Sequence, residues 1–484
     1  MSRRLFAKKS IDALRADAES GNGLRRALGP LDLTLLGIGA ILGTGIFVVT
    51  GRAAAANAGP GVVLSFLIAG CAATFAALCY SEMAAMIPVS GSAYTYAYAT
   101  MGEFVAFLIG WDLILEYSLS VALVSVGWSG YVTAFIEQIT GVVLPWQWTT
   151  APVVYSETAG ELVTTGAHFN LPAALIVAFL ALLLIRGVRE SVRFNAIIVA
   201  MKVAVVLIFV VVASRYVRVE NWTPLVPPNA GAFGKFGISG VLQAATMVFV
   251  SYIGFDAVSV AAQETRNPQR SLPIGILASL TVCTLLYMVV ALVLTGVVPY
   301  QELAVPHPIA VGIAVTGIPW LATLIDVGAI AGLTSVMLVM LMAQPRILMS
   351  MARDGLLPKA VGKVHPRLGT PHWTTLATGS ACALAGGLFS VELLGELVSL
   401  GTLFAFVLVS LGVMILRIMR PELERPFRVP FGPYVVPLAS AAISGMLMFT
   451  ATTPTMLRLL AWMGLGVAFY CLYTRRVPTV SHPG

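Results

Sequence analysis

The sequence predicts an all-α integral membrane protein with about twelve transmembrane helices, and three observations support that prediction. Of its 484 residues, 58% are hydrophobic and only 11% are charged, whereas soluble domains carry about 25% charged residues. The mean hydropathy of +0.90 leaves too little polar surface to cover a soluble globule of this size. The apolar residues also recur in blocks of roughly 20, the length with which a helix crosses a bilayer. Because lipid cannot satisfy backbone hydrogen bonds, such blocks are expected to be helices.

The individual spans follow from apolar runs that are divided by Gly, Pro and charged residues. We expect them at 31–57, 61–86, 102–136, 171–187, 194–216, 238–263, 272–298, 319–349, 373–390, 393–417, 434–452 and 456–474. The first thirty residues are polar and basic and lack an apolar core, so no cleaved signal peptide is expected.

The distribution of Lys and Arg predicts the orientation, because these residues are retained on the cytoplasmic side. With the N-terminus inside, the cytoplasmic segments contain 23 Lys and Arg and the opposite face contains 5. We therefore expect a multi-pass protein of the plasma (inner) membrane with both termini in the cytoplasm. The net charge of +7 is then a topology signal and does not indicate a nucleic-acid partner.

The spans divide into five, five and two. We expect a cytoplasmic segment (1–30), a five-helix repeat (31–217), a second five-helix repeat (238–417) and two C-terminal helices (434–474). Because five is odd, the second repeat must cross the membrane upside down relative to the first. Inverted repeats of this kind are typical of transporters that hold their substrate near the midplane, where the first helix of each repeat is broken.

The first expected break lies in GIGAILGTGIF (Gly37–Phe47), which has four glycines in eleven residues. Glycine costs about 1 kcal/mol in a helix interior and frees the backbone. Close helix packing is an alternative that explains the four-residue spacing of Gly39 and Gly43. The tighter run Gly43–Gly45 favours an unwound stretch, where amide groups at the start of the outer half-helix point at an anion.

The second expected break lies in FVSYIGFDAV (Phe249–Val258), with Gly254 at its centre and the acidic Asp256 beside it. Two half-helix ends that face each other suit a zwitterion, because amide donors take a carboxylate and freed carbonyls take an ammonium. An amino acid satisfies both ends at once.

At these residues the chain resembles the amino acid–polyamine–organocation (APC) superfamily, and within it the bacterial relatives of cationic amino acid transporters. The matching stretches run in order along the chain: GIGAILGTGIFVVTG (Gly37–Gly51), PVSGSAYTYAY (Pro88–Tyr98), GEFVAFLIGWDLILEY (Gly102–Tyr117), SYIGFDAV (Ser251–Val258), ETRNPQRSLPIGI (Glu264–Ile276), ARDGLLP (Ala352–Pro358) and RPFRVP (Arg425–Pro430). The resemblance implies the LeuT-type fold, with discontinuous first and sixth helices, and amino acid transport.

By position, the resemblance also implies a set of substrate-binding residues. They lie on the two breaks and on the eighth span: Ile41, Gly43, Thr44, Gly45, Val250, Ser251, Ile253 and Leu333. Amides of the Gly43–Gly45 run would face the substrate carboxylate, and carbonyls of the remaining break residues would face its ammonium. The side chains of Val250, Ile253 and Leu333 would line the pocket.

Charged residues inside the spans are costly, so each is a functional hypothesis. Asp112 and Asp326 are interpreted mainly as residues that tie helices together by hydrogen bonds. For Glu116 and Asp256, position and resemblance indicate a part in proton transfer or gating. The structural role of tying helices together is an equal alternative for both. Tyr287, in the middle of the seventh span, joins this proton-coupling set.

Lys202 is the only Lys or Arg that lies well inside a span and is counted on neither face of the membrane. It lies about 12 Å along the fifth helix, too far from the helix end for a snorkelling lysine. Sodium-coupled proteins of the LeuT-type fold hold a sodium ion between the first, fifth and eighth spans, and here an ammonium could supply that charge. Lys202 is therefore predicted to be the proton-responsive group. The alternative is a permanently charged strut paired with Asp256 or Glu116.

These features favour a secondary active transporter of L-amino acids over an enzyme or a channel. The five His are scattered over loops and the tail, and two facing half-helices imply a closed pocket. The apolar pocket positions favour small neutral substrates such as alanine, with arginine or lysine as the alternative. Proton symport is favoured, while obligatory exchange stays open. Amino acid, protons and membrane lipids are the expected partners of a monomer, and no cofactor or metal is expected.

Overall fold

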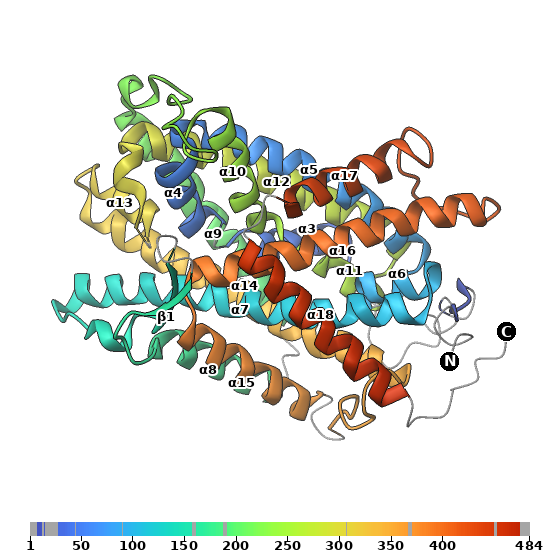
Figure 1. The fold of residues 1–484 in the computed structure, drawn as a ribbon. Helices are drawn as coiled ribbons and strands as arrows, with labels where there is room; N and C mark the ends of the chain where they lie inside the picture. Colours follow the sequence, from blue (N-terminus) through green and yellow to red (C-terminus); the bar gives the residue numbers. More distant parts are fainter. Residues whose placement is uncertain are drawn as a thin grey trace.

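The structure is a computed structural model and is almost entirely helical. It describes residues 7–11, 14, 28–43, 45–89, 91–156, 161–186, 191–305, 307–365, 370–449 and 453–474. Figure 1 shows the long helices packed roughly side by side, with β1 and α13 at one end of the molecule and α6 at the opposite end. The predicted cytoplasmic segment 1–30 falls largely outside the described residues.

The first half of the chain forms the helices of the first five predicted spans, together with α6, which lies between the second and third of them. They are α3 (Pro30–Ile41), α4 (Thr50–Ala53), α5 (Val62–Met86), α6 (Ser92–Thr100), α7 (Glu103–Thr140), α8 (Leu171–Arg186) and α9 (Ser191–Ala213). π-helical turns Gly45–Val49 and Ala54–Ala58 flank α4. Two short antiparallel strands, β1 (Val153–Ser156) and β2 (Glu161–Thr164), pair in the loop between α7 and α8.

The second half forms the helices of the remaining predicted spans, together with α13, which lies between the seventh and eighth of them. They are α10 (Gly237–Phe249), α11 (Ala257–Val260), α12 (Pro268–Val297), α13 (Pro308–Ala314), α14 (Pro319–Arg353), α15 (His372–Leu388), α16 (Val391–Met419), α17 (Val435–Phe449) and α18 (Thr453–Thr474). Short 3-10 turns occupy Trp146–Trp148, Ser214–Tyr216, Val219–Trp222, Val250–Tyr252, Ala262–Glu264 and Tyr300–Leu303, and a further one, Gly59–Gly61, joins the first two spans.

Many of these helices can cross a membrane. Among the described residues, eight helical stretches have the length and apolar composition required, and one of them, Pro30–Met86, contains the first two predicted spans. The helices Leu171–Arg186 and Val435–Phe449 are shorter but also apolar. Each predicted span coincides with helical residues in the structure, so the prediction of an all-helical integral membrane protein is confirmed.

Helices at equivalent positions in the two predicted repeats pack against each other. α5 packs on α12, α7 on α14 and α8 on α15, and these pairs are the second, third and fourth helices of each predicted five-helix unit. α17 packs on α5 and α16, outside these pairs. The packing therefore pairs helices that hold the same position in the two predicted repeats.

Both expected breaks are present in the backbone. α3 ends at Ile41. Leu42 is extended, and its N–H donates a 2.9 Å hydrogen bond to the carbonyl oxygen of Ile38. The chain resumes as the π-helical turn that begins at Gly45. α10 ends at Phe249, and the helix resumes only at Ala257 after Gly254 with φ +113°, a backbone conformation that favours glycine.

Candidate functional site

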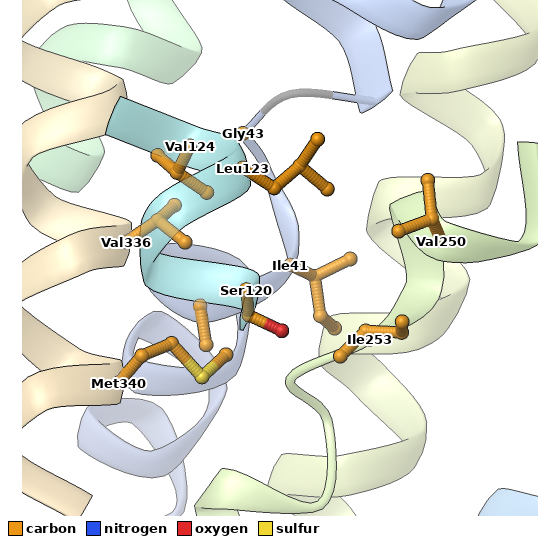
Figure 2. A pocket seen from close by; sticks show the side chains of 10 residues that line it. Ile41, Gly43, Ser120, Leu123, Val124, Val250, Ile253, Val336 and Met340 are labelled. Atoms are coloured by element: carbon orange, nitrogen blue, oxygen red, sulfur yellow. The ribbon is translucent and has the colours of Figure 1, made fainter. Parts of the chain in front are cut away.

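A cavity lies between the two breaks and two long helices. Its walls come from α3, α7, the sixth-span break and α14, through Ala40, Ile41, Gly43, Ser120, Leu123, Val124, Val250, Ile253, Val336 and Met340. Figure 2 shows Val336 and Met340 on one side of this space, Val250 and Ile253 on the other, and the hydroxyl of Ser120 directed between them. The cavity volume is about 20 Å³, room for about one water molecule.

The glycines of the first break allow close approach of neighbouring helices. A Cβ atom on Gly43 would lie 2.9 Å from Cγ2 of Val336, and one on Gly45 would lie 2.3 Å from the Cβ of Ser251. Real Cβ atoms essentially never approach other atoms within 3.0 Å. The first break therefore contacts both α14 and the sixth-span break because these positions lack a side chain.

The second break is packed just as closely. A Cβ atom on Gly254 would lie 2.8 Å from Cε of Met340 and 3.0 Å from the carbonyl oxygen of Ala40. The side chain of Ser251 is 2% exposed, and its hydroxyl has no hydrogen-bond partner among the described residues. α14 therefore touches one break through Val336 and the other through Met340.

Lys202 on α9 is completely buried and reaches the first break. Its ammonium donates to the carbonyl oxygens of Gly39 at 2.7 Å and Leu42 at 2.8 Å, and to the hydroxyl of Ser335 at 3.2 Å. These three acceptors match the three N–H donors of a protonated lysine. No ion pair of Lys202 occurs among the described residues, so the alternative strut with Asp256 or Glu116 is not the arrangement seen here.

Tyr287 on α12 connects the two breaks. Its hydroxyl lies 2.6 Å from the carbonyl oxygen of Ile41 and 2.7 Å from that of Ser251. A phenol has one proton to donate, so it bonds one carbonyl at a time. Carbonyls from both broken helices therefore converge on a single donor.

Three of the four acidic residues singled out in the spans, Asp112, Glu116 and Asp256, gather on α7 and beside α11. Asp256 accepts a 2.6 Å hydrogen bond from the hydroxyl of Tyr117. Glu116 lies within electrostatic range of Asp256 and Asp112, and the three carboxyl groups are at most 2% exposed. Both oxygens of Asp112 lack a hydrogen-bond partner among the described residues. The helix-tying bonds expected of Asp112 are thus not present, and one oxygen of Asp326 is likewise without a partner there.

Charged contacts also close the end of the molecule that we expect to face the cytoplasm. Arg346 near the end of α14 lies 2.9 Å from Glu264, which follows the second break. Asp354 pairs with Lys9 of the N-terminal segment and accepts a 2.6 Å hydrogen bond from Tyr94. These contacts join the N-terminal segment, α6 and the end of α14.

The structure brings most of the predicted substrate-binding residues together. Four of them line the cavity: Ile41, Gly43, Val250 and Ile253. Gly45 and Ser251 touch each other beside it, whereas Thr44 lies outside the described residues. Leu333 is fully buried and does not line the cavity.

Sequence reasoning missed the wall formed by the third and eighth spans. This wall consists of Ser120, Leu123, Val124, Val336 and Met340. The only sequence signal for it was the apolar character of both spans, which does not distinguish the face of a helix that lines a cavity from its other faces. Val336 lies three residues and Met340 seven residues after Leu333, on the same stripe of α14 but about one and two turns further along the helix.

Paired broken helices around a cavity lined mainly by apolar side chains are typical of membrane transporters that hold their substrate near the midplane. The amino acid permease family model matches residues 28–471. The branched-chain amino acid permease BcaP of Bacillus subtilis is 47% identical over 98% of this chain and 99% of its own length. The methylthioribose transporter of the same organism is 45% identical over 98% of both chains. The chloroplastic cationic amino acid transporter 9 of Arabidopsis thaliana is 40% identical over 86% of this chain and 70% of its own.

The chain therefore belongs to the amino acid permease family of the APC superfamily. Like the family and its relatives, it is a multi-pass membrane transporter and not an enzyme. The resemblance inferred from the motifs is confirmed over nearly the whole chain.

Proposed function

We propose that this protein is a proton-coupled symporter of neutral L-amino acids, with small substrates such as alanine favoured. The observation that carries the proposal is the cavity between the two broken helices, with backbone polar groups at its edge and apolar side chains around it. Backbone groups at a helix break recognise the part that all amino acids share. The apolar wall then selects among side chains.

The backbone of an amino acid fits the two breaks. Amides of the Gly43–Gly45 run face the carboxylate in this proposal, and carbonyls of Ile41, Val250, Ser251 and Ile253 face the ammonium. The convergence of the Ile41 and Ser251 carbonyls on the Tyr287 hydroxyl supports this arrangement. A substrate ammonium with three donors can use the carbonyl to which the phenol does not donate.

The wall of the cavity supports a neutral side chain. Among the described residues that line the cavity, none is acidic, so an arginine or lysine side chain would be buried without a counter-charge. A volume of about 20 Å³ also requires the cavity to widen before any amino acid enters, and alanine requires the least widening. The names of two relatives make branched-chain amino acids and methylthioribose the competitors to test.

Proton coupling is assigned to Lys202 in this proposal. Protonated Lys202 holds the inner half of the first span through Gly39 and Leu42, whereas a neutral amine has one donor fewer and no charge. Loss of the proton therefore loosens the first break from α9 and α14. Glu116, Asp256 and Tyr287 are proposed to take part in the same coupling, because Asp256 and Tyr287 belong to the polar contacts around the two breaks and Glu116 lies close to Asp256.

The membrane arrangement of the protein completes the proposal. Both termini face the cytoplasm of a plasma membrane, as the excess of Lys and Arg on that side indicates. Residues 31–217 and 238–417 form two inverted repeats, and 434–474 adds two helices. The packing of α5 on α12, α7 on α14 and α8 on α15 supports the repeats.

Uptake by proteoliposomes tests the proposal. Empty vesicles with an alkaline interior should accumulate labelled alanine above the external concentration, and dissipating the pH gradient with a protonophore should abolish the accumulation. Excess alanine, isoleucine, methylthioribose and arginine are then compared as competitors. Uptake that occurs only into vesicles preloaded with amino acid would instead identify an obligatory exchanger, and strongest competition by arginine would identify a cationic substrate.

A further inference from the structure

A second and much larger cavity lies away from the transport site, at the start of α12. Its volume is about 630 Å³, and its lining comes from the first turns of α12 and from the loop between α16 and α17. The lining residues are Asn267, Gln269, Arg270, Pro273, Ile274, Leu277, Ala278, Pro426 and Phe427. No residue of this set belongs to the transport site.

One end of this groove is polar and cationic. Arg270 is exposed, and no ion pair or hydrogen bond of its side chain is found within the described part of the chain. Asn267 and Gln269 add uncharged donors beside it. Arg428, which follows Phe427 in the chain, is a further exposed cation without an ion pair among the described residues. This end of the groove can therefore receive an anion without displacing a carboxylate.

From the lining residue Ile274 onward, exposed apolar side chains continue as a stripe along α12. Ile274, Val282, Leu285, Val289 and Leu292 are between 37% and 59% exposed. Their spacing keeps them on the same helix face as Arg270 and Leu277. From Ile274 to Leu285 the helix rises about 16 Å, close to the depth of one hydrocarbon leaflet.

We propose that this groove is a binding site for an anionic phospholipid of the cytoplasmic leaflet, with its phosphate at Arg270 and an acyl chain along the exposed face of α12. A cation above an apolar stripe on the membrane side of a helix is complementary to a lipid headgroup above its chain. A free phosphate would use only the polar end and would leave the stripe without a role. The proposal rests on the membrane orientation proposed above, which places the start of α12 on the cytoplasmic side.

The groove also explains why a bound lipid could matter for the protein. Thr265 and Arg266, directly before the groove, pair with the backbone at Leu28, two residues before α3. A lipid between α12 and Pro426–Phe427 would brace this junction from the membrane side. It would thus act next to the inner half of the first broken helix.

Native mass spectrometry of the purified protein tests the proposal. The protein is mixed with equal amounts of phosphatidylglycerol and phosphatidylcholine that carry the same acyl chains. We expect the wild type to retain phosphatidylglycerol about fivefold better, as a contribution of about 1 kcal/mol per cation near an anionic surface implies. Arg270→Gln should reduce this preference to near parity, and Arg270→Lys should keep most of it because the charge is retained.

Lys359→Gln is the matched control. Lys359 is an exposed cation that does not line the groove and that we also expect on the cytoplasmic side, so its loss should leave the preference unchanged. Equal retention of both lipids by the wild type, an unchanged preference in Arg270→Gln, or an equal loss in Lys359→Gln would each overturn the proposal. Because the readout is lipid retention, these outcomes leave the transport proposal untouched, and a failure of alanine uptake leaves the lipid result standing.

Discussion

The two helix breaks face the same cavity but are held by different chemical groups. The first break is held by a buried ammonium, since Lys202 donates to the carbonyls of Gly39 and Leu42. The second is followed by a carboxyl group, Asp256, that accepts from the phenol of Tyr117. Tyr287 contacts both breaks. The difference suggests that protonation acts differently on each break: a proton on Lys202 adds a charged donor to the first, whereas a proton on Asp256 removes a charge beside the second.

The largest effect is expected from a substitution at the contact between the two breaks. The breaks can face one cavity only if this contact is kept. A Cβ at position 45 would lie 2.3 Å from the Cβ of Ser251 and 3.0 Å from its Cα, so Gly45→Ala must push the breaks apart. We expect uptake to fall to background, at least about 100-fold, and Gly45→Leu to behave in the same way. Radiolabelled uptake per amount of folded protein measures this.

Gly464→Ala is the control for that experiment. Gly464 lies in α18, and no atom lies within 4 Å of the position that its Cβ would occupy. Its uptake and its elution in size-exclusion chromatography should match the wild type. Normal uptake by Gly45→Ala would show that the contact between the breaks is not needed for transport.

The charge that distinguishes the first break provides the second prediction. Lys202→Arg keeps a positive charge but does not lose its proton at any accessible pH. We expect accumulation driven by a pH gradient to disappear, while exchange of internal for external substrate continues at a reduced rate. The measurement compares the two modes in the same proteoliposomes. If Lys202→Arg still concentrates substrate under an imposed pH gradient, Lys202 is a strut and the coupling proton binds elsewhere, with Asp256 and Glu116 the next residues to test.

How well the sequence predicts a feature of this structure depends on whether local residues or the packing of distant helices determine it. The breaks were predictable, because four glycines within Gly37–Phe47 and Gly254 beside an acid are local departures from helix chemistry. The spans were predictable from their lengths. The contacts of Lys202 were partly predictable, because a lysine far from a helix end needs a polar partner. Its donation to Gly39 and Leu42 places the ammonium beside the first break, where the likeness to sodium-coupled proteins of the LeuT-type fold implies a positive charge.

The cavity wall was harder to predict because it depends on how each helix is rotated and how far it is shifted along its axis. Leu333, Val336 and Met340 are apolar residues on one stripe of one long helix, so the level of the cavity along the helix decides which of them line it. Similarly, α7 contributes Ser120 through a face that carries no distinctive motif. The packing of entire helices sets these rotations, and single-chain hydropathy contains little information about them.

The residue shared by both breaks gives a third and smaller expected effect. Tyr287→Phe removes the donor near the carbonyls of Ile41 and Ser251 but keeps the ring in place. Loss of the hydrogen bond in a buried site costs about 2 kcal/mol, or roughly 30-fold. We expect this loss in alanine uptake at low concentration. Tyr131→Phe is a matched control, because Tyr131 donates to the carbonyl of Phe47, above the break. A larger loss in the control would mean that the phenol at Tyr287 has no special part in joining the breaks.

The smallest effect is expected for substrate preference. It tests the two breaks separately, because each break contacts a different residue of α14. Val336 contacts Gly43 of the first break, and Met340 contacts Gly254 of the second. If the second break surrounds the substrate side chain, Met340→Ala should enlarge that part of the cavity. A few methylene groups of space should then shift competition toward isoleucine over alanine by about fivefold to tenfold. Val336→Ala, beside the backbone-binding break, should weaken the binding of all substrates alike without changing their order.

Leu333→Ala is the control for this prediction, because its buried side chain does not line the cavity. An altered ranking in Val336→Ala with none in Met340→Ala would reverse the assignment, placing the side-chain pocket at the first break.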